Sequence, residues 1–267
     1  MKQLTLDEIK QVEFQLLKTF DVFCKQNNIR YFLSNGTLLG AVKYKGFIPW
    51  DDDVDVLVPR EDYNRLIATF KDEGNVKLVS NERDSGYLFP FAKLCDMSTR
   101  KDEIGHDNGV PLGLNMDVFP LDEWDANIQK AEKEVKYISR NITGLSLAKL
   151  KRPNASTAIK RFAQGVLMII CKMYTPKYFL NKIFKKCNFK GKPKSAYLGC
   201  KAWCIYGKRE IIPAEVFEKT VEVEFGGAGF PAPIGYDTYL RSLYGDYVKD
   251  PPPEKQKTHH GFTAYRL

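Results

Sequence analysis

Apolar side chains recur at helical spacing near the start of the chain. They are, in order, Ile9, Val12, Leu16, Phe20 and Phe23. This spacing of three or four residues places them on one face of a helix. Just before them, Thr5 and Glu8 have the spacing of a capping box, which marks a helix N-terminus. The pattern therefore predicts an amphipathic helix over residues 6–26.

Short apolar runs then alternate with amphipathic stretches. Strands are predicted at residues 29–33, 53–59, 75–80, 87–97 and 112–121, and helices from about residue 37, over 61–70 and over 236–243. Pro59 ends the second of these strands, because proline cannot donate to a strand ladder. This order of elements predicts an α+β fold with a small mixed sheet flanked by helices.

The length of 267 residues suits one large domain or two small ones. No run approaches the roughly 20 apolar residues that span a bilayer, and the acidic, amphipathic start does not have the pattern of a signal peptide. We therefore expect a cytoplasmic protein, or a peripheral one on the inner face of the cytoplasmic membrane. The cysteines are then expected to be reduced thiols.

Charge is distributed very unevenly along the chain. The formal net charge is +8, yet residues 135–209 contain 18 Lys and Arg and no Asp or Glu. The remainder is acidic, so the pattern indicates an acidic body with a basic insert. Such a segment typically faces a polyanion or an anionic membrane surface. Its apolar side could be formed by Phe162, Val166, Ile169 and Ile170; the alternative is an ordinary core helix with solvated lysines.

Four aspartates stand at the start of the predicted strand over residues 53–59. Strand alternation places Asp51, Asp53 and Asp55 on one face, with Asp52 on the other. The valines that follow share the side of Asp52: they are Val54, Val56 and Val58. Three neighbouring carboxylates repel one another unless a cation or protons neutralise them. A bound Mg²⁺ or Mn²⁺ would do so, because hard divalent ions take carboxylate oxygens.

An acidic run can also arise without a catalytic metal. A solvated acidic turn would carry such charges, but it does not explain the alternating valines. A calcium-binding EF-hand loop requires Gly and Glu where this chain has Val56 and Asp62, which excludes it. A structural calcium site stays open. Asp117 lies between apolar strand residues and is either an edge residue or, as we favour, a further metal ligand or general base.

Gly36 and Thr37 precede the aspartates by about fifteen residues. Gly36 allows the backbone to approach a ligand closely, and Thr37 could cap the following helix, whose N-terminus would bind phosphate. Lys43 would add positive charge beside that phosphate.

Together these residues carry a family resemblance. The stretch that includes Gly36 and the aspartates, and then the segments around Lys93, Asp117 and the C-terminal tail, occur in the order typical of the LicD family: they read "SNGTLLGAVKYKGFIPWDDDVDVLVPREDY", "FAKLCD", "NMDVFPLD" and "YGDYVKDPPPEKQKTHH". The chain resembles this family of phosphocholine transferases, which is related to the fukutin group and similar to polymerase-β-like nucleotidyltransferases. The resemblance skips the basic insert.

The resemblance implies a fold and an activity. It implies a nucleotidyltransferase-like catalytic core over residues 1–134, a basic helical insert over 135–209 that contacts membrane or acceptor, and a C-terminal segment over 210–267 that docks on the core. The implied reaction moves phosphocholine from CDP-choline to a sugar hydroxyl of a lipid-linked bacterial glycan, a teichoic acid or lipopolysaccharide precursor, and releases CMP. No nucleic-acid partner is expected.

The resemblance also implies roles for residues. Asp53 and Asp55 would hold Mg²⁺ or Mn²⁺ against the diphosphate, Asp51 would be a further ligand, and Asp117 would complete the site and help deprotonate the acceptor. The implied substrate-binding residues are Gly36, Thr37, Lys43, Trp50, Lys93, Lys257 and His259. Lys93 could instead be a surface lysine, and the tail residues could be solvated.

Aromatic faces bind quaternary ammonium groups such as choline. The candidates are Trp50 first, then Tyr44, Tyr87 and Phe89. Three other functions remain open: transfer of ribitol or glycerol phosphate from a CDP carrier, nucleotidyl transfer from an NTP, and a non-catalytic binding protein. A zinc site among Cys171, Cys187, Cys200 and Cys204 is a minor alternative, since the spacing lacks paired Cys-x-x-Cys motifs.

Overall fold

A mixed β-sheet lies at the centre of the computed structural model, which describes residues 1–103, 105–187, 195–258 and 261–267. Its main path is β2 (Phe32–Leu33), β3 (Asp55–Pro59), β7 (Leu114–Glu123), β5 (Ala92–Asp96) and β4 (Val76–Val79). Strands β3 and β7 are parallel, and the other pairs along this path are antiparallel. The predicted α+β fold is confirmed.

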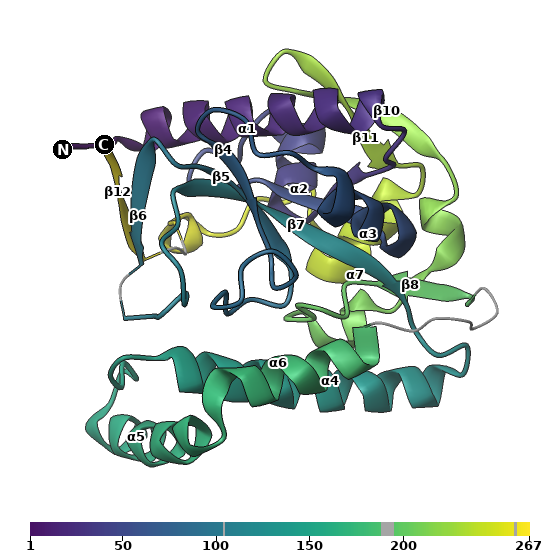
Figure 1. The fold of residues 1–267 in the computed structure, drawn as a ribbon. Helices are drawn as coiled ribbons and strands as arrows, with labels where there is room; N and C mark the ends of the chain where they lie inside the picture. The colour runs from purple at the N-terminus through teal and green to yellow at the C-terminus, as the bar shows by residue number, and fades with distance from the viewer. Residues whose placement is uncertain (104, 188–194, 259–260) are drawn as a thin grey trace.

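Helices cover both sides of this sheet. Figure 1 shows α1 (Leu6–Gln26) above it and the group α4 (Ile128–Lys149), α5 (Ala158–Met173) and α6 (Thr175–Cys187) below it. The predicted capping box forms: the Glu8 backbone N–H donates to the Thr5 hydroxyl, and the Thr5 N–H donates to the Glu8 carboxylate. The helix over residues 6–26 is thus confirmed at both ends.

Three shorter helices complete the fold around the central sheet. They are α2 (Asn35–Tyr44), α3 (Arg60–Thr69) and α7 (Tyr236–Tyr244). The start of α2 lies two residues earlier than expected. Strand β3 begins at Asp55 and not at residue 53, because the Asp51 N–H bonds the Ile48 carbonyl in a turn and the chain reaches the sheet only afterwards.

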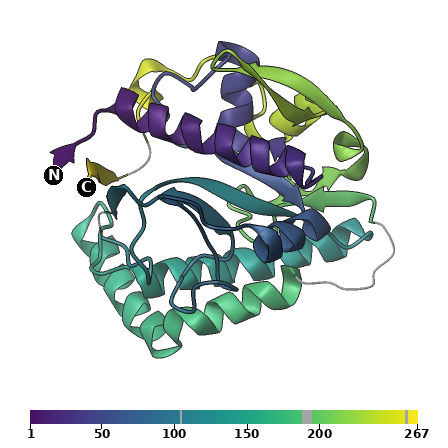
Figure 2. The same ribbon diagram turned by 45° about the horizontal axis from the view of Figure 1, so that its top comes forward.

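The C-terminal part of the chain wraps back over the fold. Strand β12 (Phe262–Arg266) joins β1 (Lys2–Gln3) and β6 (Thr99–Glu103) in a small sheet, so both termini lie together (Figure 2). A hairpin of β10 (Thr220–Phe225) and β11 (Ala228–Pro233) packs beside β2. Its turn uses Gly226 and Gly227 at positive φ, a conformation that glycine adopts without strain. The sequence pattern did not predict this hairpin.

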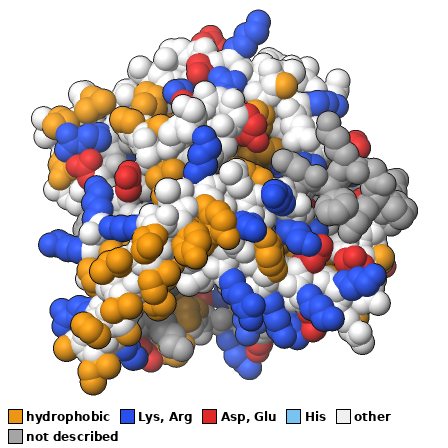
Figure 3. All heavy atoms as spheres, turned by 60° about the horizontal axis from the view of Figure 1, so that its bottom comes forward, with side chains coloured by type: hydrophobic (Ala, Val, Ile, Leu, Met, Phe, Trp, Pro, Cys, Tyr) orange, Lys and Arg blue, Asp and Glu red, His pale blue; other side chains and the backbone are white. Residues whose placement is uncertain are grey.

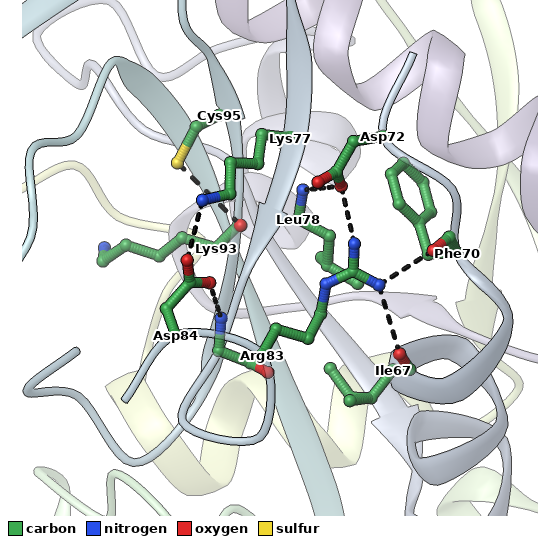
Figure 4. Close-up of polar contacts among 10 residues, drawn as sticks. Ile67, Phe70, Asp72, Lys77, Leu78, Arg83, Asp84, Lys93 and Cys95 are labelled. Atoms are coloured by element: carbon green, nitrogen blue, oxygen red, sulfur yellow. Dashed lines mark hydrogen bonds and ion pairs between the residues drawn. The ribbon is translucent and has the colours of Figure 1, made fainter. Parts of the chain in front are cut away.

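A polar network supports the connection between β4 and β5. Arg83 donates to the backbone carbonyls of Ile67 and Phe70 at the end of α3 and to Asp72 (Figure 4). Beside it, Lys77 pairs with Asp84 at 2.7 Å. These contacts hold the loop that leads into β5, the strand of Lys93.

The predicted basic insert, residues 135–209, does not coincide with one group of elements. Residue 135 lies inside α4, and β8 (Tyr197–Gly199) pairs with both β7 and β9 (Ile212–Pro213) in the central sheet. Between them, Lys201 is buried and pairs with Glu134 at 2.9 Å. The division of the chain at residues 134 and 209 stays a prediction. Among the described residues, no helix combines the length and the apolar character needed to cross a bilayer.

Candidate active site

The register of β3 and β7 brings two carboxylates together. These strands are parallel, and Asp55 stands directly opposite Asp117. The backbone N–H of Asp117 also donates to the Val54 carbonyl at 2.8 Å. Residues 62 positions apart in the sequence are thereby fixed side by side on two neighbouring inner strands, with Asp51 and Asp53 in the segment that leads into β3.

All four predicted metal ligands line one cavity of about 1040 Å³. The wall contains Asp51, Asp53, Asp55 and Asp117, whereas buried Asp52 is not part of it. The predicted separation of Asp52 from the other three is therefore seen. Strand alternation explains only Asp55, because residues 51–54 are irregular backbone.

Asp55 is held by hydrogen bonds at both its backbone and its carboxylate. Its backbone N–H donates to the Thr37 hydroxyl at 2.8 Å, and the Asn35 amide donates to its carboxylate at 3.1 Å. Burial raises its pKa well above the ordinary value, and the charges of Asp53 and Asp117 raise it further. A cation at this wall would relieve that repulsion.

Asp117 has a buried lysine as its partner. Lys93 stands opposite Asp117 on β5, and its ammonium group is ion-paired with the Asp117 carboxylate, which also accepts from the Asn115 amide at 2.9 Å. Burial tends to lower the pKa of Lys93, but the Asp117 charge outweighs it and the pKa is raised. The structure thus places Lys93 behind Asp117, outside the cavity wall.

The N-terminus of α2 approaches the carboxylates closely. A Cβ atom on Gly36 would lie 2.6 Å from a carboxylate oxygen of Asp51, so only glycine fits there without movement. Gly36 lines the cavity, as does Asn35. The Thr37 side chain is buried and is engaged by the Asp55 N–H, so its observed contact is with the strand that carries the aspartates.

Another part of the wall combines Lys43 of α2 with charged residues of the C-terminal tail. Lys43 pairs with Asp250 at 2.6 Å, and the Tyr44 hydroxyl donates to the same carboxylate. Lys257 lines the cavity too, while the predicted site residue His259 lies outside the described residues.

Aromatic rings form much of the remaining wall. Predicted Trp50 and Tyr44 are among them, with ring centroids 6.4 Å apart. Tyr87 and Phe89 are buried in the core and do not line the cavity. The sequence reasoning missed a further aromatic set: Trp203, Tyr206, Tyr244 and Tyr247. The signal available was the aromatic spacing in "KAWCIYGKRE" and "YLRSLYGDYV".

A buried carboxyl group, Glu210, lies in the same wall as the missed aromatic set. It accepts the Tyr206 N–H at 3.2 Å, and burial raises its pKa to about 8. The Tyr206 and Tyr244 hydroxyls are 3.0 Å apart, with the two rings nearly perpendicular. The sequence reasoning did not single out this glutamate.

The donor set suits a hard divalent cation, although the side chains are not already arranged around one. Across the part of the chain that is described, no three His, Cys, Asp or Glu side chains converge as a ready metal cage. One carboxylate oxygen of Asp117 is taken by Lys93 and Asn115. The four carboxylates nevertheless share one wall, and the raised pKa of Asp55 marks a site that lacks positive charge. Among the cysteines, Cys187, Cys200 and Cys204 are buried, and burial raises the pKa of each thiol.

Comparison with known proteins shows the family to which the chain belongs. A family model described as "LicD/FKTN/FKRP, nucleotidyltransferase domain" matches residues 28–139, the part of the chain that carries all four carboxylates. The chain is 30% identical, over 276 aligned residues and the full length of both proteins, to the lipopolysaccharide cholinephosphotransferase LicD of Haemophilus influenzae. The chain belongs to the LicD family of phosphocholine transferases, and it is an enzyme.

Two shorter matches are proteins of Rickettsia without an assigned function. One, from Rickettsia typhi, is 37% identical over 78 residues, which are 28% of this chain and 25% of that protein. The other, from Rickettsia prowazekii, is 47% identical over 73 residues, which are 26% of this chain and 27% of that protein. These matches carry no information about substrate.

Proposed function

We propose that this protein transfers phosphocholine from CDP-choline to a sugar hydroxyl of a lipid-linked lipopolysaccharide or teichoic acid precursor and releases CMP. The observation that carries the proposal is the pair Asp55 and Asp117, set in register on one wall of a cavity whose other walls hold lysines and aromatic rings. The named full-length relative acts on lipopolysaccharide, which supports this acceptor class.

Mg²⁺ or Mn²⁺ would be held by Asp53, Asp55 and Asp117, with Asp51 as a further ligand. When bound, the ion neutralises the charge of the diphosphate during phosphoryl transfer. Lys93 and Asn115 bind one oxygen of the Asp117 carboxylate, and Asp117 also lines the cavity, so we assign its other oxygen to the substrate side. That oxygen is suited to accept the proton of the acceptor hydroxyl.

The chain's other groups position the donor. The start of α2 reaches the cavity, because Asn35 and Gly36 line it beside the carboxylates, and a helix N-terminus suits a phosphate group. Lys43 and Lys257 add positive charge to the wall. Phosphoryl transfer depends mainly on such positioning and charge neutralisation.

Choline would lie among Trp203, Tyr206 and Tyr244, beside Glu210. A quaternary ammonium group binds aromatic faces, and its positive charge would favour the ionised form of Glu210, whose pKa burial otherwise raises to about 8. Elsewhere in the wall, Asp250 is already neutralised by Lys43, whereas within the described residues no Lys or Arg pairs with Glu210. Ribitol or glycerol phosphate would gain little from the aromatic faces, which supports choline as the transferred alcohol.

The reaction is proposed to take place at the inner face of the cytoplasmic membrane, where a lipid-linked acceptor is available. A peripheral protein suits this location, since the chain must reach an acceptor whose lipid stays in the bilayer.

The test is CMP release by purified protein supplied with CDP-choline, Mg²⁺ and a lipid-linked glycan extract. We expect turnover that disappears with EDTA and falls by about three orders of magnitude in Asp53→Asn. Asp52→Asn is the matched control, because it removes the adjacent charge outside the cavity wall. Equal loss in both variants, or turnover of CDP-glycerol or CDP-ribitol with none of CDP-choline, would overturn the proposal.

A further inference from the structure

Helix α5 exposes its apolar side chains in place of burying them. Residues Ile159, Phe162, Val166, Ile170 and Met173 follow one another at helical spacing and are all exposed, Ile159, Phe162 and Met173 to more than three quarters. Ile169 is 66% exposed beside them. These six residues are called here the α5 patch.

The opposite side of α5 faces the protein. Met168 is buried, and Gln164 and Cys171, four residues before and three after it, are half-buried. The helix is therefore anchored on α4 and α6 through one face, and the α5 patch points away from the body of the molecule. A contiguous exposed apolar surface of this kind marks an interaction site.

Positive charge surrounds the α5 patch. Lys160, Arg161, Lys172 and Lys177 are exposed on or next to the helix, and no Asp or Glu occurs in residues 135–209. Figure 3 shows the hydrophobic side chains gathered at the lower left of this face, with Lys and Arg side chains beside them. Tyr174 and Tyr178 are also partly exposed at the start of α6, and tyrosine is enriched where proteins meet the lipid headgroup region.

We propose that the α5 patch inserts in the plane of an anionic lipid bilayer, with its apolar side chains at the acyl boundary and the flanking Lys and Arg on the headgroups. The 16 residues of α5 are too short to span a bilayer but suit a helix that lies in the interface. Membrane binding by α5 is independent of the chemistry of the cavity. It rests on the proposed function in one respect, because a lipid-linked acceptor gives the protein a reason to bind a membrane.

A second copy of the chain fits the α5 patch less well. In a twofold dimer the same surface faces itself, which would bring two rims rich in Lys and Arg together without acidic partners. Lysine is also depleted at protein–protein interfaces. Anionic lipid satisfies both the apolar patch and its charge.

The test is co-sedimentation of the full-length protein with vesicles, in the absence of donor and acceptor, so that the result does not depend on catalysis. We expect binding to mixed phosphatidylglycerol and phosphatidylcholine vesicles, weaker binding to phosphatidylcholine alone, and weakening by salt. Ile169→Glu should reduce partitioning on the order of 100-fold. Val22→Glu, at an exposed apolar position on α1, is the matched control and should bind like the unmodified protein.

Tryptophan fluorescence is a second readout, which reports directly whether a side chain of the α5 patch enters the lipid. Phe162→Trp should show a blue-shifted emission on vesicles, and Val22→Trp should not. Equal binding of Ile169→Glu and the unmodified protein would overturn the proposal. So would a dimer in solution that Ile169→Glu dissociates, without vesicle binding; that outcome would assign the α5 patch to a second copy of the chain.

Discussion

At the scale of single residues, the site depends on carboxyl groups whose neighbours differ. Asp117 is held by a buried ammonium group, Asp55 by the Asn35 amide beside other carboxylates, and Glu210 by backbone N–H groups. The carboxyl group therefore has three electrostatic environments along one cavity wall. Those of Asp117 and Glu210 lead to specific predictions.

Lys93 is predicted to act by positioning Asp117. Lys93→Met should lower kcat by about 10- to 100-fold with little change in the KM for CDP-choline, because Lys93 lies outside the cavity wall. It should also destabilise the fold by about 3–5 kcal/mol, since it leaves a carboxylate without its buried partner.

Lys77→Met is the control for Lys93. Lys77 lies on β4, next to the strand of Lys93, where it pairs with Asp84 (Figure 4), and its side chain is 39% exposed. Its replacement should change kcat by less than about twofold. Equal effects of the two variants on kcat would contradict a positioning role for Lys93.

Glu210 is predicted to lower stability at alkaline pH. Its pKa is about 8 in the folded protein and about 4.5 unfolded, so the native state binds the extra proton between these values and loses stability as pH rises through them. Glu210→Gln should therefore raise the free energy of unfolding by roughly 2–4 kcal/mol above pH 8 and hardly at all below pH 4.5. Nearby Cys204 and Tyr206 have pKa values of about 12 and do not titrate in this window.

Urea unfolding of Glu210→Gln across this pH range measures the effect. A difference that is independent of pH would contradict the assignment. A second check uses the ligand: above pH 8, where Glu210 is ionised, Glu210→Gln should raise the KM for CDP-choline about tenfold and leave CDP-glycerol binding unchanged.

At the scale of elements, local patterns predicted much of the framework. The capping box and the 3.6-residue period located α1 to the residue, and the alternating valines identified β3. These signals are local, because they report hydrogen bonding and burial within one element. The start of β3 was misplaced by two residues, since the turn at Ile48–Asp51 cannot be read from hydrophobic alternation.

Pairings between distant segments were not predictable in the same way. Asp55 pairs in register with Asp117, and β8 joins the sheet although it lies within the predicted basic insert. Both pairings join segments more than 60 residues apart in the sequence. The aromatic wall is another case: Trp203 and Tyr244 come from segments that the charge pattern placed in different parts of the chain. The four aspartates were found because three of them alternate within five residues and the fourth, Asp117, is flanked by apolar strand residues.

The close approach of α2 to the carboxylates can be tested by substitution of Gly36. In Gly36→Ala the new methyl group would lie 2.6 Å from the Asp51 carboxylate and push it away, so activity should fall by about 100-fold. The fold should be hardly affected, because alanine is favourable in a helix. Gly46→Ala is the matched control, since its nearest contact is 3.8 Å. Comparable activity of the two variants would contradict the close approach of α2 to the site.

At the scale of the whole molecule, the cavity draws on nearly the full chain. Its wall includes α2, the start of β3, the middle of β7, the segment around Trp203 and the tail that carries Asp250 and Lys257. The α5 patch lies on a separate layer below the sheet (Figure 1). Chemistry and surface attachment are thus assigned to different elements and can be lost separately by substitution.

The proposed reaction requires that phosphocholine itself, rather than a nucleotidyl group, moves to the glycan. Mass spectrometry of the lipid-linked acceptor distinguishes the two after reaction with CDP-choline that carries isotopically labelled choline. We predict a product with one labelled phosphocholine for each CMP released, and none with Asp53→Asn. A glycan that gains a cytidylyl group, or label that remains entirely with soluble products, would contradict phosphocholine transfer by this enzyme.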